Sequence, residues 1–105
     1  MEKIICAANY YNDNKEYAYQ PINIKIGFIT CGRRHHNCIV TFAQIVKFPY
    51  SEESSLIQDT EIQGFLTSTN RFVDRFEAYQ IALKQNQIVN TKDLIVNKLF
   101  SENLY

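Results

Sequence analysis

The residues best suited to chemistry form one basic run, Gly32-Arg33-Arg34-His35-His36-Asn37. This run lies where a predicted strand meets a predicted helix, and a helix N-terminus presents free N–H donors and the positive end of the helix dipole. Arginine guanidinium groups match phosphate oxygens with two parallel hydrogen bonds. A phosphate or pyrophosphate ligand therefore explains these residue types together. The alternative is a solvated basic corner that pairs with the acidic segment 51–59.

A second group of candidate residues lies in the segment 63–75, which reads Q-G-F-L-T-S-T-N-R-F-V-D-R. Phe65 could stack on a base, and Thr67 could hydrogen-bond to ribose or phosphate. Arg71 or Arg75 could pair with a phosphate. The alternative is a hairpin whose aromatic side chains simply fill the core. That alternative is favoured for Phe72 and stays open for Phe65.

Metal and nucleophilic chemistry fit the sequence less well. His35 and His36 are adjacent, so their side chains point in different directions, and the spacing of Cys31 and Cys38 is not that of a zinc site. Cys38 beside a histidine could be a nucleophile, but it falls on the apolar stripe of a predicted helix, where buried structural thiols are more common. We therefore predict no metal, no cofactor and no enzymatic activity.

The elements that must position these residues follow from the hydrophobic pattern. Strands are predicted over 3–11, 22–26 with its extension to 30, 61–67 and 71–73. Helices are predicted over 37–47, from Asp74 with its capping residue Glu77, and over 91–100, whereas 51–59 is predicted to be a loop. Asn70 suits a positive-φ position in the turn 68–70. This order predicts an α+β fold, a small antiparallel sheet with two main helices packed on one face.

Composition limits the partners. The chain has 105 residues, which predicts a single domain over 1–105, and its 11 basic and 11 acidic residues give no net charge. A neutral chain lacks the basic stripe that DNA or RNA binding requires, and it has no field that would draw it to an anionic membrane. The three cysteines, without an export signal, indicate reduced thiols in the cytosol. The tyrosines between positions 10 and 19 favour a subunit interface slightly over the edge of the core.

Several segments resemble a known family. The sequence letters G-R-R-H-H-N-C-I, the central G-F-L-T-S-T-N-R-F-V-D-R-F-E-A and the segments I-I-C-A-A and L-F-S-E-N-L-Y are similar to those of the first type of Thoeris anti-defence protein, a family of phage sponges. Asn70 departs from the glycine expected in many relatives, and segment 48–60 has no match. The positions that the resemblance assigns to ligand binding are Arg33, Arg34, His35, Phe65, Thr67, Asn70, Arg71 and Arg75.

The resemblance implies a function that composition alone does not indicate. Members of that family bind glycocyclic ADP-ribose, hold it intact and so silence a host immune effector, and some also bind cyclic oligonucleotides. They assemble as dimers or hexamers with ligand pockets between subunits. For this chain we therefore expect a homo-oligomeric sponge in the cytoplasm of the infected bacterial host. Two alternatives stay open: an enzyme that cleaves a cyclic nucleotide signal, and a protein-interaction inhibitor of a host defence enzyme, which would expose a large apolar patch.

Overall fold

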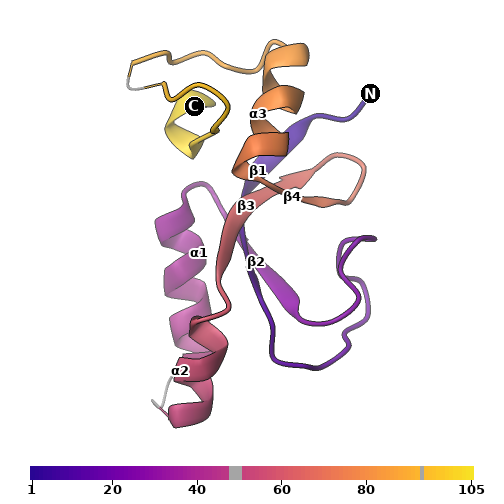
Figure 1. Ribbon diagram of the computed structural model, residues 1–105, viewed down its shortest axis with the longest axis vertical. Helices are drawn as coiled ribbons and strands as arrows, with labels where there is room; N and C mark the ends of the chain where they lie inside the picture. The colour runs from indigo at the N-terminus through magenta and orange to yellow at the C-terminus, as the bar shows by residue number, and fades with distance from the viewer. Residues whose placement is uncertain (48–50, 93) are drawn as a thin grey trace.

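The computed structural model describes residues 1–47, 51–92 and 94–105 of the chain. Four strands form one antiparallel sheet in the order β2-β1-β3-β4, so that β2 and β4 are its edges. Along the chain the elements are β1 (Ile4–Tyr11), β2 (Phe28–Gly32), α1 (His35–Phe42), α2 (Glu52–Gln58), β3 (Ile62–Thr67), β4 (Phe72–Asp74) and α3 (Arg75–Lys84), as Figure 1 shows. The predicted α+β fold with an antiparallel sheet is confirmed.

The core lies between one face of the sheet and the helices α1 and α3. Ala7, Phe65 and Val73 stand in one row across β1, β3 and β4, because they are register partners. Buried side chains from both helices pack against this row, namely Cys38 from α1 and Ala78, Tyr79 and Ala82 from α3. The prediction that two main helices cover one face of the sheet is confirmed.

Stacked aromatic rings extend the core along α1. The Tyr11 ring lies 3.9 Å from the Phe42 ring and 5.8 Å from the Phe28 ring, measured between centroids. The Tyr11 hydroxyl donates a hydrogen bond of 2.6 Å to the Glu61 carboxylate. Burial and the neighbouring Glu61 charge both raise the pKa of Tyr11, so the phenol stays neutral. The stacked rings fix the end of α1 on β1, and the hydrogen bond ties Tyr11 to the residue that precedes β3.

The hairpin of β3 and β4 matches the sequence prediction closely. Asn70 adopts a φ of 61° in the turn, a conformation that Asn tolerates better than most residues. Asp74 caps α3, because its carboxylate accepts a hydrogen bond of 2.8 Å from the Glu77 N–H. The buried face of α3 was predicted less well: Phe76 and Leu83, expected in the core, are 57% and 55% exposed.

Residues 12–27 contain no strand, although 22–26 alternates as a strand would. We call this segment the strap. Its path is set by hydrogen bonds to distant main-chain groups and by the buried Pro21, whose ring removes an N–H that a strand would need. The strand prediction for 22–26 is therefore wrong, and the alternation marks no buried face, because Ile22 is 70% and Ile26 is 37% exposed.

Two further predictions of secondary structure are also wrong. Ser51–Asp59 was expected to be a loop, yet Glu52–Gln58 is the helix α2, because the Ser51 hydroxyl accepts a hydrogen bond from the Ser54 N–H and caps it. The described part of 91–100 forms turns and one bridge between Ile95 and Lys98 instead of a helix. Within the described ranges, no helix combines the length and the apolar character that a bilayer crossing requires.

Candidate functional site

The two arginines of the basic run do come together, and they do so around Tyr105. Arg34 donates a hydrogen bond of 2.6 Å from Nη2 to the main-chain oxygen of Tyr105. The guanidinium carbons of Arg33 and Arg34 lie 5.4 and 5.3 Å from the centre of the Tyr105 ring, within cation–π range. We call these three residues the basic corner. Sequence reasoning missed Tyr105, because nothing local connects it with positions 33 and 34.

His35 does not belong to the basic corner, although it is the next residue. Its side chain is buried, and Nε2 donates a hydrogen bond of 2.7 Å to the carbonyl oxygen of Gly64 on β3. The ring also meets Phe65 edge-on, at 5.0 Å between centroids and 90° between planes. Burial lowers the pKa of His35, which favours the neutral ring. The geometry makes His35 a link between α1 and β3 rather than a surface ligand contact.

Phe65 and Thr67 also point into the protein. Phe65 is 0% exposed and sits in the core, so its ring is not available to stack on a base, and the core alternative is the one observed. Thr67 is 1% exposed, and its hydroxyl donates a hydrogen bond of 2.7 Å to Glu2. The alternation along β3 places Phe65 and Thr67 on the helix-covered face. The pattern was visible in the sequence, but the side covered by helices was not.

The other predicted ligand contacts already have partners. Arg71 donates two hydrogen bonds of 2.8 Å to Glu2 and one of 2.6 Å to Glu77. Arg75 donates to the Leu99 carbonyl and to Gln63, and its guanidinium lies 4.3 Å from the Phe100 ring centre. Asn70 occupies the hairpin turn. The structure therefore places Arg33 and Arg34 together at Tyr105, with Arg33 exposed and Arg34 partly buried, and it pairs Thr67 and Arg71 with Glu2.

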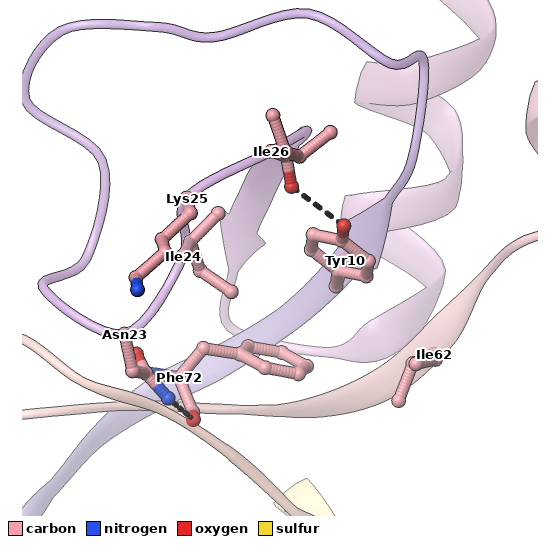
Figure 2. A pocket seen from close by; sticks show the side chains of 7 residues that line it. All are labelled: Tyr10, Asn23, Ile24, Lys25, Ile26, Ile62 and Phe72. Atoms are coloured by element: carbon pink, nitrogen blue, oxygen red, sulfur yellow. Dashed lines mark hydrogen bonds between the residues drawn. The ribbon is translucent and has the colours of Figure 1, made fainter.

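A pocket of about 400 Å³ lies on the other face of the sheet, between the sheet and the strap (Figure 2). We call it the open-face pocket. It is lined by Tyr10, Asn23, Ile24, Lys25, Ile26, Ile62 and Phe72. Its walls are aromatic and aliphatic, with one ammonium group, from Lys25. This is the usual make-up of a small-molecule site, mainly apolar with a few polar groups.

Hydrogen bonds hold the strap over the sheet. Asn23 donates from Nδ2 to the Phe72 carbonyl at 2.7 Å and accepts from the Phe72 N–H at 2.9 Å, so its side chain pairs with β4 as a strand would. The Tyr10 hydroxyl donates to the Ile26 carbonyl at 2.6 Å (Figure 2). The Ile29 N–H of β2 donates to Gln20 at 3.0 Å. The strap is thus bonded to both edge strands, β2 and β4.

Gly64 makes room for the aromatic wall of the pocket. A Cβ atom at this position would lie 2.8 Å from the tip of the Phe72 ring and 2.1 Å from the Val73 carbonyl oxygen. Without it, the Phe72 ring reaches across β3 and lies 6.1 Å from the Tyr10 ring. Phe72 is buried, as predicted, but on the face opposite to the core. The aromatic residues of the first strand are the feature of the sequence that indicates this site. The strap that completes the site alternates as a strand would, so the sequence does not reveal it.

The described residues contain no group of three or more His, Cys, Asp or Glu side chains placed to hold a metal ion. The candidate site thus consists of two parts: the open-face pocket, which offers ring surfaces and one ammonium, and the basic corner, which offers guanidinium groups. Neither part places a nucleophile beside a base in the manner of a hydrolase.

Comparison with known proteins identifies the chain as a phage protein. The family described as phage T4 y16D protein matches residues 3–105, nearly the whole sequence, and the chain belongs to this family. No curated protein and no solved structure matches the chain significantly.

Proposed function

We propose that this phage protein binds a nucleotide signal of the cyclic ADP-ribose class in the open-face pocket and sequesters it intact. The observation that carries the proposal is the lining of the pocket, which combines the Tyr10 and Phe72 rings with the side chain of Lys25. Aromatic rings accept a base by stacking, and an ammonium pairs with a phosphate. The resemblance to phage sponges supplies the ligand class, and the action takes place in the cytoplasm of the infected host.

The strength of such a site can be bounded. A stacked base contributes about 1–3 kcal/mol, and a charge-assisted hydrogen bond contributes about 1.5–3 kcal/mol. Their sum is at most about 6 kcal/mol, which corresponds to a Kd of roughly 40 μM. A sponge must bind more tightly than this, so a second copy of the chain that covers the pocket is part of the proposal. The exposed Tyr19 and Ile22 of the strap supply an apolar rim for that copy.

The test compares binding with turnover. The protein is titrated by calorimetry with cyclic ADP-ribose isomers, linear ADP-ribose and cyclic dinucleotides, and native mass spectrometry reports the bound mass and the number of subunits. Heating the complex should release the ligand with unchanged mass. A cleaved product would favour the enzyme alternative. Failure of every ligand to bind with a Kd below about 40 μM, a free energy of about 6 kcal/mol, would refute the sponge proposal.

Two lysines of the strap provide a matched pair of variants. Lys25→Ala removes the pocket ammonium and should weaken binding by about 10–150-fold, the equivalent of one charge-assisted bond. Lys15→Ala removes the same charge from an exposed position outside the pocket lining and should leave the affinity unchanged. Equal losses in both variants would indicate non-specific attraction of the anion instead of a site.

A second candidate function is supported by the outer face of α3. Phe76 and Leu83 are more than half exposed, and they lie on the same side of the helix because they are seven residues apart. An exposed apolar helix face is the feature expected of a protein-interaction inhibitor. If no nucleotide binds while purified host defence enzymes are inhibited by the protein, and Phe76→Ser abolishes that inhibition, this second function replaces the first.

A further inference from the structure

The turn between β3 and β4 holds the carboxylate of Glu2, which comes from the N-terminal end of the chain beside this hairpin (Figure 1). The Thr67 hydroxyl donates to Glu2 Oε2 at 2.7 Å, and the Thr69 hydroxyl donates to the same oxygen. Arg71 donates from Nε to Oε2 and from Nη2 to Oε1, both at 2.8 Å. Two hydroxyl and two guanidinium donors therefore bind one carboxylate, and the arginine supplies the paired bonds by which it recognises such groups.

The turn is built without help from Glu2. The Asn70 N–H donates to the Thr67 carbonyl at 3.0 Å, and the Thr67 N–H donates to the Arg71 carbonyl at 2.9 Å. The Arg71 N–H also donates to the Thr67 hydroxyl oxygen at 3.3 Å, which leaves the hydroxyl proton for a ligand. Glu77 of α3 holds the Arg71 guanidinium from a second direction at 2.6 Å. Because these contacts do not involve Glu2, the donors should stay arranged for a carboxylate when Glu2 is absent.

Glu2 belongs to the short segment before β1, which begins at Ile4. This segment is attached to the turn through Ser68, whose N–H donates to the Lys3 carbonyl and whose hydroxyl accepts from the Lys3 N–H, both at 2.8 Å. The side chains of Glu2 and Arg71 are 22% and 31% exposed, so solvent reaches the ion pair. The segment can therefore leave the turn while β1 keeps its place in the sheet.

A small pocket next to Glu2 leaves room for the rest of a ligand. It measures about 220 Å³ and is lined by Met1, Glu2, Ile81, Lys84 and Gln85. Met1 and Glu2 belong to the segment that would leave, so the space grows when they do. Ile81 offers an aliphatic contact, and Lys84 and Gln85 offer polar groups. The volume lies below that of sites for drug-sized ligands, which points to a small molecule.

We propose that Thr67, Thr69 and Arg71 form a carboxylate-binding site, which the chain fills with its own Glu2 and which accepts the carboxylate of a small organic acid when Glu2 leaves. A singly charged ligand replaces the charge of Glu2, whereas Glu77, which shares Arg71, disfavours the second charge of a phosphate. The inference is independent of the proposed nucleotide binding, because these three residues do not line the open-face pocket.

The experiment opens the site with Glu2→Ala and adds sodium acetate at pH 7 and constant ionic strength. The Tm of this variant should rise in a saturable manner, by about 6–11 °C at ten times the half-saturating concentration. The amide NMR signals of residues 67–71 should shift along the same binding curve. Sodium chloride and inorganic phosphate should raise the Tm less. Absence of a saturable rise with acetate, or a larger rise with phosphate, would overturn the proposal.

Two comparisons separate a site from a general effect of salt. Glu16→Ala removes a carboxylate from an exposed position of the strap, so it should respond to acetate only as weakly as the parent, in which Glu2 fills the site. Glu2→Ala combined with Arg71→Gln removes the main donor and should abolish the saturable response. An equal response of the parent and Glu2→Ala would overturn Glu2 as the occupant, and a response retained in the double variant would overturn the site.

Circular dichroism checks that each variant is folded. If Glu2→Ala folds only when acetate is present, the proposal is supported, because the acid then replaces the missing side chain. If Glu2→Ala stays unfolded even in acetate, the proposal is overturned, because the turn then depends on Glu2 itself.

Discussion

Replacing Phe65 by Ala tests whether this ring serves the core or a ligand. The ring is 0% exposed and contacts the buried His35 ring edge-on at 5.0 Å. Truncation of a core Phe costs about 3–5 kcal/mol, and the lost aromatic pair is part of that cost. Each kcal/mol lowers the Tm of a domain near this size by about 4–8 °C, so the Tm of Phe65→Ala should fall by about 12 °C or more.

Urea unfolding at pH 7 measures the change in the free energy of unfolding. An unchanged m-value, the dependence of that free energy on urea concentration, indicates that the denatured state is the same. Ile62→Ala, on the same strand but 48% exposed, is the control and should cost less than about 1 kcal/mol. If Phe65→Ala unfolded like the parent and had lost nucleotide binding, the ring would belong to a ligand site, and our interpretation of the core would be wrong.

Three further predictions concern pH and the hairpin turn. Because burial lowers the pKa of His35 below 6.5, the unfolded chain takes up a proton that the folded chain does not, so the free energy of unfolding should decline as pH falls below about 6.5. His35→Gln should remove this pH dependence from urea midpoints measured from pH 8 to 5. The hydrogen bonds from Arg71 are the main cause that lowers the pKa of Glu2 from 4.5 to about 2, so their stabilisation is present above pH 4.5 and is lost as pH falls towards 2. In Glu2→Gln, the urea midpoint should therefore change less with pH between 4.5 and 2 than in the parent. An unchanged pH dependence would contradict the ion pair. Asn70→Gly should keep the parent stability, whereas Asn70→Ala should lose about 1–2 kcal/mol by thermal or urea unfolding, because its φ is positive; equal stability of the two variants would show that the turn conformation is different.

The parts of the fold that were predicted correctly have local causes. Asn70 and Asp74 act within four residues of their own positions, through a left-handed turn and a helix cap, so their types alone indicate the hairpin and the start of α3. Cys38 was correctly assigned to the buried side of α1, because the apolar stripe at helical spacing is also a local pattern.

The parts that were missed depend on distant partners. Alternation over 22–26 resembles a strand, and only the pairing of Asn23 with Phe72, 49 positions away, makes it a loop. Arg71 looks available in the sequence, yet Glu2, 69 positions before it, neutralises it. No spacing rule connects such residues, so the ligand contacts predicted from residue type alone were scattered over the structure.

The strap has a consequence for how copies of this protein can meet. An edge strand with free N–H and C=O groups invites strand addition from another chain, which leads to open-ended β-aggregation. On β4, the N–H and C=O of Phe72 are already occupied by Asn23, and on β2 the Ile29 N–H is occupied by Gln20. A second copy would have to displace these side chains before it could extend the sheet there. The oligomer that we propose is therefore expected to form through the surfaces of the helices and the strap, and not by adding strands at these edges.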